Sequence, residues 1–233
     1  MIELKNEYFE AMGEPAPFTP FGLIDKYRFN LVASKLLSGS VLDAGAYFGD
    51  FLKKITSRDS DRKIYGTEVN EKRKEVANKN LGKEVVRVDF INGKFSTFAN
   101  NSVDNVVCTE VIEHVSDHIL AVRELCRVAR KRIIITVPFN EKIQYQLCIY
   151  CCKWTPNAGH LHTFGYGDFD KLIPGGWKIT KEFSFGNMAA QLIASRLPQN
   201  KIGEFLIEKF DWILSRLLPK RNRWLFVIID KKG

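Results

Sequence analysis

The fold is decided by the stretch Ser40-Val41-Leu42-Asp43-Ala44-Gly45-Ala46-Tyr47-Phe48-Gly49-Asp50. An apolar run comes first, two glycines punctuate a turn, and the apolar residues that follow return at helical spacing. A strand that turns tightly into a helix near the start of a chain is typical of a nucleotide-binding α/β fold. Counted from Gly45, a pyrophosphate loop needs glycine at the third and sixth positions, so that backbone amides can approach the phosphates. Those positions hold Tyr47 and Asp50, so the loop favours a nucleoside ligand without phosphates.

Strand-like and helix-like segments alternate along most of the chain. Strands are expected at 40–45, 63–68, 84–89, 103–108, 132–138, 177–185 and 224–230, and helices at 23–37, 48–57, 71–81, 116–130, 166–174 and most of 188–218. Such alternation implies right-handed βαβ units. We therefore expect an α/β fold: a Rossmann-like, doubly wound sheet of seven mostly parallel strands, with an antiparallel last strand and helices on both faces.

The chain has the size and composition of one globular domain. It has 233 residues, of which 45% are hydrophobic, and this is enough for a full core. We expect a single domain over 1–233, with an N-terminal arm or lid at 1–22, an insertion over the active-site edge at 140–165 and a helical cover at 188–218.

Charge and composition indicate where the protein is located, whether it has disulfides and which partners it could bind. The sequence contains no apolar run long enough to span a membrane, and its N-terminus lacks the apolar core of a signal peptide, so we expect a cytoplasmic protein. Five cysteines, an odd number, do not indicate a disulfide framework. The net charge of +8 permits an anionic partner, but a solvated basic surface explains it equally well.

Three acidic residues end three successive strands of the expected sheet. Asp43 ends the first strand, Glu68 the second and Asp89 the third. One such acid is often only a turn cap. Ligands of open α/β sheets bind at the carboxyl ends of the strands, where an acid about twenty residues beyond the first turn accepts hydrogen bonds from ribose. The three acids together predict a nucleoside site, with Phe90 against the base.

The fourth strand leads into Thr109-Glu110-Val111-Ile112-Glu113-His114-Val115. Together with Leu-Asp-x-Gly at 42–45, Glu68 and Asp89-Phe90, this segment resembles the ordered motifs of class I S-adenosylmethionine-dependent methyltransferases. The chain is most similar to the small-molecule group that includes the ubiquinone-pathway O-methyltransferases, over residues 25–140. The resemblance implies S-adenosylmethionine as cofactor. The residues that would bind it are Asp43, Gly45, Ala46, Tyr47, Glu68, Val69, Asp89, Phe90, Thr109 and Glu110.

In this resemblance the first turn lines the methionine part of the cofactor and Glu68 holds the ribose. Asp89 and Phe90 contact the adenine, and Thr109-Glu110 lies on the other side. The chain departs from the family at Tyr47, where glycine is usual.

Three histidines are candidate catalytic bases, because imidazole titrates near neutral pH. His114 could be a base, but the Glu113-His114 pair occurs in resembling proteins with different acceptors, which favours a structural role. His160 and His162 follow the fifth strand and could deprotonate an acceptor hydroxyl, or could hydrogen-bond the backbone of their own loop. The three candidates remain open.

Cysteines precede these histidines at spacings that can bind zinc. Cys148, Cys151 and Cys152 could join His160 or His162. A second clean pair of ligands is missing, and the thiols are also typical of a buried apolar segment. We therefore expect no metal.

Apolar residues recur at helical spacing over 201–218, with Lys and Arg beside them. Such a stripe usually packs on its own domain. The alternative is a helix that lies on an anionic membrane or covers a lipid-like acceptor, so peripheral membrane contact through 201–223 is retained.

The sequence thus predicts methyl transfer to an oxygen or nitrogen of a small acceptor that is hydrophobic or linked to lipid or glycan. The alternative is a non-catalytic cofactor-binding or regulatory module of the same fold. We expect no nucleic-acid partner, because the strand-end motif of amino-methylating nucleic-acid enzymes is absent, and the oligomeric state is left open.

Overall fold

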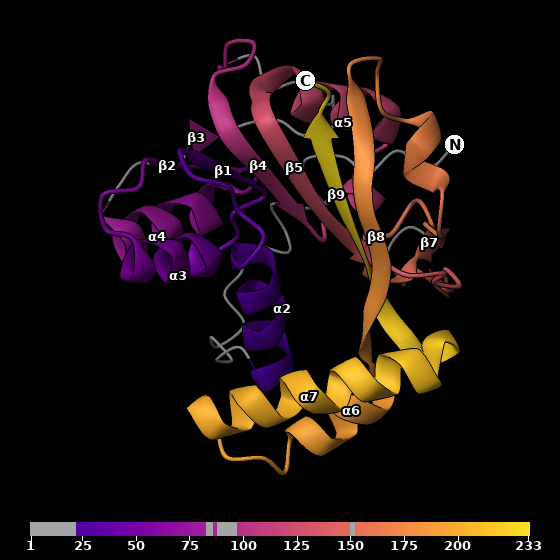
Figure 1. Ribbon diagram of the computed structural model, residues 1–233. Helices are drawn as coiled ribbons and strands as arrows, with labels where there is room; N and C mark the ends of the chain where they lie inside the picture. Colours follow the sequence, from indigo (N-terminus) through magenta and orange to yellow (C-terminus); the bar gives the residue numbers. More distant parts are fainter. Residues whose placement is uncertain (1–21, 83–85, 88–96, 150–151) are drawn as a thin grey trace.

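A seven-stranded sheet forms the centre of the protein (Figure 1). The computed structural model describes residues 22–82, 86–87, 97–149 and 152–233. In spatial order the strands are β3 (Val86–Arg87), β2 (Ile64–Glu68), β1 (Val41–Ala44), β4 (Val103–Thr109), β5 (Ala129–Pro138), β9 (Asn222–Lys231) and β8 (Trp177–Asn187). The first five run parallel, and β9 lies antiparallel between β5 and β8. This confirms the expected sheet with its antiparallel last strand.

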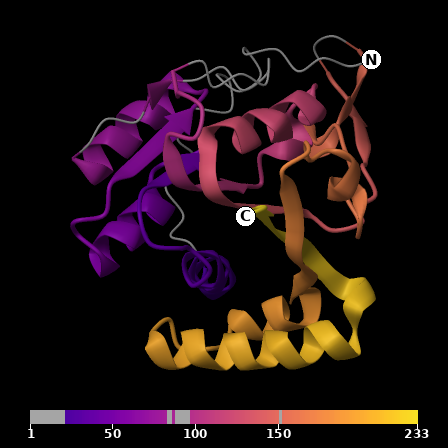
Figure 2. The ribbon, with the colours of Figure 1, turned by 45° about the horizontal axis from the view of Figure 1, so that its top comes forward.

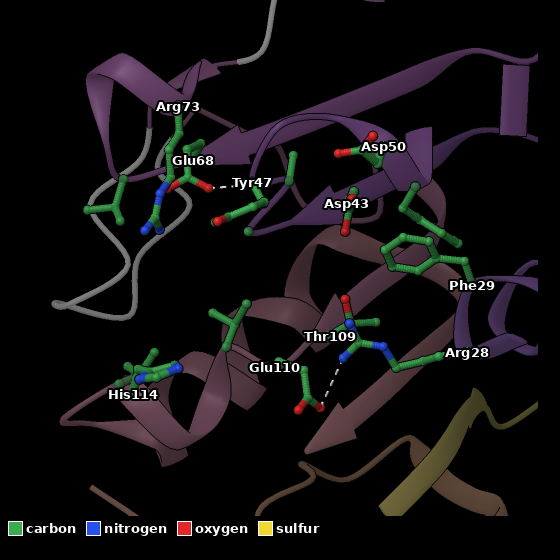
Figure 3. Close-up of a pocket in the computed structure, with 16 residues that line it drawn as sticks. Arg28, Phe29, Asp43, Tyr47, Asp50, Glu68, Arg73, Thr109, Glu110 and His114 are labelled. Carbon is green, nitrogen blue, oxygen red and sulfur yellow. Dashed lines mark hydrogen bonds and ion pairs between the residues drawn. The ribbon is translucent and has the colours of Figure 1, made fainter. Parts of the chain in front are cut away.

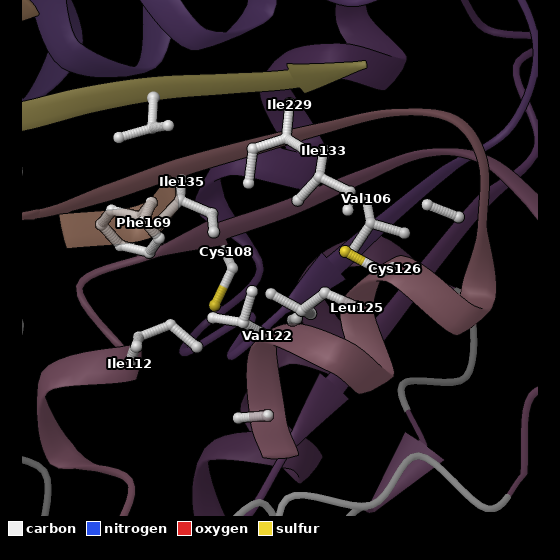
Figure 4. Close-up of a cluster of buried hydrophobic side chains, with 14 of the residues drawn as sticks. Val106, Cys108, Ile112, Val122, Leu125, Cys126, Ile133, Ile135, Phe169 and Ile229 are labelled. Atoms are coloured by element: carbon white, nitrogen blue, oxygen red, sulfur yellow. The ribbon is translucent and has the colours of Figure 1, made fainter. Parts of the chain in front are cut away.

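Helices cover both faces of the sheet (Figure 1). Their bounds are α2 (Leu23–Ala33), α3 (Asp50–Arg58), α4 (Glu71–Leu81), α5 (His118–Val128), α6 (Met188–Ala194) and α7 (Lys201–Leu217). Side chains alternate between two cores, as the period of a strand requires. Val106 and Cys108 face α5, as Figure 4 shows, whereas Val107 belongs to the core under α2 and α3.

Local sequence signals set the ends of α4, and the expected bounds 71–81 coincide with the observed helix. The Asn70 side chain accepts a hydrogen bond from the Arg73 amide at 2.9 Å and caps the N-terminus. Gly82 ends the helix in the left-handed conformation, with φ of 60°. The same helix follows β2, so its cap lies beside the end of that strand.

Other expected elements differ in extent. The helix expected over 23–37 ends at Ala33, and only a 3-10 turn at Asp168–Lys171 forms where 166–174 suggested a helix. The cover at 188–218 is broken into α6 and α7 around Pro198. A Cβ on Gly203 would lie 1.9 Å from the Pro198 carbonyl oxygen, so α7 needs glycine there. The arm expected at 1–22 lies outside the described residues except for residue 22.

The segment 140–165 forms a closed loop with its own hairpin, β6 (Tyr145–Leu147) against β7 (Trp154–Pro156). Phe139 and Phe164 form a bridge at its base, where the Asn140 amide also donates to the Phe164 carbonyl at 2.8 Å. The insertion therefore begins and returns beside the carboxyl end of β5.

A further layer, made of α6 and α7, lies at one end of the sheet (Figures 1 and 2). β9 starts directly after this layer, and its Trp224 pairs with Pro138 at the carboxyl end of β5. The layer is therefore on the side of the sheet where the parallel strands end. None of the described helices combines the length and apolar character needed to cross a membrane.

Candidate active site

A cavity of about 390 Å³ lies at the carboxyl ends of β1, β2 and β4 (Figure 3). It is lined by Arg28, Phe29, Asp43, Gly45, Ala46, Tyr47, Asp50, Phe51, Glu68, Val69, Arg73, Thr109, Glu110, Val111, His114 and Val115. All eight cofactor-binding candidates among the described residues are in this lining. Asp89 and Phe90 lie outside the described residues.

The turn between β1 and α3 brings backbone close to the cavity. The amides of Gly45 and Ala46 both donate to the Thr67 carbonyl, at 3.0 and 2.8 Å. Gly45 has φ of +91°, and a Cβ there would lie 2.4 Å from Val111 Cγ2. Tyr47 adopts φ of 52°, which is uncommon for a residue with a side chain. The turn thus accommodates Tyr47 without loss of the strand-turn-helix unit, at the expense of backbone strain.

Glu68 connects this turn to the second strand. Its Oε2 accepts from the Tyr47 amide at 2.9 Å, and its Oε1 accepts from the Asn70 amide at 3.1 Å (Figure 3). The carboxyl is almost fully buried, and burial raises its pKa, against the lowering effect of these amides and Arg73. Each carboxylate oxygen has two lone pairs, so Glu68 retains capacity to accept from a ligand hydroxyl.

Asp43 ends β1 with an unsatisfied oxygen. The side chain is buried, and its Oδ1 has no hydrogen-bond partner. Burial first, and then the charge of Glu68, raise the pKa of Asp43 well above its ordinary value. An unpaired buried oxygen costs free energy unless a partner is supplied. A ligand with a cationic or hydrogen-bond-donating group at this point would supply one.

Arg28 and Glu110 form the opposite wall of the cavity. Arg28 Nη1 lies 3.6 Å from Glu110 Oε1 (Figure 3). The Arg28 guanidinium also stacks over the Trp224 ring at 5.0 Å. Glu110 also accepts from Trp224 Nε1 at 2.8 Å and from Thr136 Oγ1 at 3.2 Å. Glu110 has φ of 54°, so the cavity holds a second strained backbone position.

Sequence reasoning did not assign Arg28 to the site. It occupies a buried position within the apolar stripe of α2, and a charged residue in such a stripe is the signal that could have revealed it. Phe29, Phe51, Arg73, Val111 and Val115 were also not predicted. Val111 and Val115 lie within the quoted motif at 109–115, but the resemblance gave them no role.

His114 and His160 meet beside the cavity. Their ring centroids are 4.8 Å apart, and only His114 lines the cavity. His114 Nδ1 lies 3.1 Å from the Gly159 carbonyl, so this nitrogen donates and Nε2 is unprotonated. Burial first, and then the neighbouring His160, lower the pKa of His114 to about 4. His160 Nδ1 bonds the Glu141 carboxylate, which orients its ring.

Glu113 lies next to this pair and is fully buried. Neither carboxylate oxygen has a hydrogen-bond partner, and burial followed by the charge of Glu110 raises the pKa of Glu113 well above its ordinary value. One ligand atom each from Glu113, His114 and His160 lie within 4.8 Å of one another, so this cluster could hold a divalent cation.

The cysteines do not belong to that cluster. In the described part of the chain neither Cys148 nor Cys152 is in a group of potential metal ligands, and Cys152 is exposed. Cys151 lies outside the described residues. The expectation of no metal stays a prediction.

His162 is placed differently from His160. Its Nε2 donates to the Val115 carbonyl at 2.9 Å, and its ring packs on His118 with centroids 4.0 Å apart. The amide of Leu161 donates to the Glu113 carbonyl at 2.7 Å. His162 does not line the cavity. These bonds fasten the loop at 159–162 to the turn after β4.

Residues 42–135, less than half of the chain, match a family model described as a methyltransferase domain. No curated protein matches the chain. A solved S-adenosylmethionine-dependent methyltransferase from Mesorhizobium loti is 16% identical with a TM-score of 0.60, and the match covers 90% of this chain and 100% of that one. The corresponding enzyme from Archaeoglobus fulgidus is 18% identical with a TM-score of 0.58, covering 89% and 97%.

The cyclase SpnF is also similar, at 14% identity and a TM-score of 0.58, covering 88% of this chain and 79% of that one. At these identities the solved structures show the fold. The matched domain and the fold together make this protein similar to S-adenosylmethionine-dependent methyltransferases. S-Adenosylmethionine is the cofactor that this similarity implies.

The cavity fits this cofactor. The unpaired Oδ1 of Asp43 can accept from a cationic group such as an ammonium, and Glu68 retains lone pairs that can accept from hydroxyls. Arg28 and Glu110 provide charges of both signs on the facing wall.

Proposed function

We propose that the protein transfers the methyl group of S-adenosylmethionine to an oxygen or nitrogen of a small acceptor that is hydrophobic or linked to lipid or glycan. The observation that carries this proposal is the contact between His114, in the cavity wall, and His160, on the loop outside it. A proton acceptor thereby lies next to the cofactor cavity, which a module that only binds the cofactor does not need.

We assign the cofactor contacts by position along the sheet edge. Asp43, Gly45, Ala46 and Tyr47 would hold the methionine part, and Glu68 with Val69 the ribose. Thr109 and Glu110 line the facing wall. Asp89 and Phe90 keep the role of adenine partners as a prediction.

When bound, the cofactor supplies a methyl group already activated for displacement. The chain then has to align the acceptor, exclude water and accept one proton from a hydroxyl acceptor. During methyl transfer, Nε2 of His160 would accept the proton of the acceptor hydroxyl. Glu141, bonded to Nδ1, stabilises the imidazolium that forms.

His160 suits this role better than its neighbours. The lowered pKa of His114, about 4, makes it a weak proton acceptor at neutral pH, so we assign it to positioning the Gly159 loop. His162 uses Nε2 to hold the Val115 carbonyl. Both remain alternative bases.

A transfer assay tests the proposal. Radiolabelled S-adenosylmethionine is incubated with an extract fractionated by polarity, and we expect label in apolar or lipid-linked material. The His160→Ala variant is the control, since it should bind cofactor normally and transfer little. Cofactor binding without label in any fraction would support the non-catalytic module, which Tyr47 in the cofactor turn keeps as the second candidate.

A further inference from the structure

The outer side of α7 carries a row of large apolar side chains that the rest of the described chain leaves exposed. Ile202 is 64% exposed, Phe205 57% and Leu217 70%. Intervals of three and four residues place these on one side of a helix, together with Ile213. Leu192, 72% exposed, extends the patch onto the adjacent α6. We call this set the α6–α7 face.

Positive charge lies within this face. Lys209 and Arg216 fall on the same helical row and are exposed. The Arg216 guanidinium stacks on Trp212 at 4.0 Å, and the Lys209 ammonium lies 5.3 Å from the centre of the Phe205 ring. Apolar rings and cations therefore share one surface.

Two of the three acidic residues of α7, Glu204 and Asp211, point away from this face. Glu204 accepts from Asn30 Nδ2 on α2 at 3.2 Å. Asp211 is fully buried and accepts the amides of Gly186 and Asn187 at the end of β8. Glu208 is exposed and, together with Trp212 and Arg216, borders a cavity between α7, α2 and β8. The sequence of α6 contains no charged residue. On the exposed side of α7, Lys209 and Arg216 thus outnumber Glu208, and the net charge of the face is positive.

This distribution identifies the occupant. A second copy of the chain in a two-fold dimer would bring two faces of net positive charge together, which is unfavourable. An anionic lipid surface complements both properties, since it takes the apolar rings at the acyl boundary and the cations at the headgroups. We propose that the α6–α7 face binds anionic membranes peripherally.

The location of the α6–α7 face would bring a bound membrane to the side of the protein that holds the cofactor cavity. The layer lies at the end of the sheet where the parallel strands finish, and α2 spans between it and the cofactor cavity through Arg28 and Phe29 (Figures 1 and 2). A docked membrane would therefore lie on the side from which a lipid-linked acceptor reaches the site. The membrane binding itself does not depend on the proposed methyl transfer.

Vesicle co-flotation of the full chain tests the proposal without any acceptor. We expect binding to vesicles of phosphatidylcholine with phosphatidylserine, little binding to phosphatidylcholine alone, and loss of binding at high salt. Replacing Lys209 and Arg216 with glutamine should lower the partition coefficient about fivefold for each cation removed. Replacing Phe205 and Leu217 with glutamine should lower it at least about tenfold.

Ile119→Gln with Lys79→Gln is the matched control, because both residues are exposed and lie on α5 and α4, away from the face. It should bind vesicles like the wild type. Far-UV circular dichroism and cofactor titration establish that each variant is folded. Equal binding to neutral vesicles, equal loss in the control, or no binding by the full chain would overturn the proposal. So would a dimer in light scattering that the Phe205 and Leu217 changes dissociate, since a second copy would then cover the face.

Discussion

Glu68 has a structural role and a proposed ribose-binding role, and substitution by glutamine or by alanine can separate the two. In the structure its oxygens hold the Tyr47 and Asn70 amides, and in the proposed complex they also accept the ribose hydroxyls. A hydrogen bond to a charged group contributes about 1.5–3 kcal/mol, and a neutral one about 0.5–1.5 kcal/mol. Glu68→Gln therefore weakens each of two ribose bonds by about 1 kcal/mol, which raises the dissociation constant roughly 30-fold.

The effect on folding distinguishes glutamine from alanine. Glutamine keeps one oxygen for a backbone amide and removes a charge whose burial is unfavourable, so we expect about 1 kcal/mol of lost stability. Glu68→Ala leaves both buried amides without an acceptor and should cost about 2–6 kcal/mol, a large part of a typical total of about 5–15 kcal/mol.

Calorimetric titration with S-adenosylmethionine measures the affinity, and urea unfolding without cofactor measures stability. Glu75→Gln, at an exposed position on α4, is the control and should change neither quantity. A folded Glu68→Gln protein that binds cofactor as tightly as the wild type would refute the assignment of Glu68 to the ribose.

Three further predictions concern the cavity. Asp43→Asn should weaken cofactor binding yet raise the stability of the cofactor-free protein. Because the native pKa of Asp43 is raised, its carboxyl increasingly destabilises the folded protein as the pH rises above the ordinary pKa near 4. The stability gained by the substitution, measured by urea unfolding, should therefore grow with pH. Tyr47→Gly should change stability by less than about 1 kcal/mol, since relief of the positive φ offsets the lost stacking of Arg73 and the entropy of glycine, whereas Tyr47→Val should be clearly less stable than both. His160→Ala should lower turnover roughly 10²–10⁴-fold, while His162→Ala should mainly lower the melting temperature; the reverse order would make His162 the base.

The parts of the fold that sequence predicted well are those governed by local chemistry. The alternation of helix-like and strand-like segments predicted the parallel sheet, and Asn70 and Gly82 mark the two ends of α4. The start of β5 at Ala129 was missed, because α5 ends only at Val128 and no turn residue separates the two. Ala129 joins the sheet through its pairing with Val103, which is a tertiary contact that local propensity does not report.

In the site, too, local sequence predicted some residues and only tertiary contacts place the others. Residues at strand ends follow from the pattern of the sheet, and those in the described chain line the cavity. Arg28 belongs to a helix before the first strand, so only the folded chain places it opposite Asp43. The preference for His160 over His162 rests on Glu141, which lies nineteen residues from His160 and meets it only because 140–165 folds back on itself.

The bonds between the turn after β4 and the loop at 159–162 have a kinetic consequence. Three hydrogen bonds hold that loop, and they join Glu113 to Leu161, His114 to Gly159 and Val115 to His162. One side of this junction faces the cofactor and the other carries the proposed base, so neither can shift alone. We expect the two substrates to add in a fixed order, cofactor first, with the demethylated cofactor leaving last and competing with the next molecule of S-adenosylmethionine.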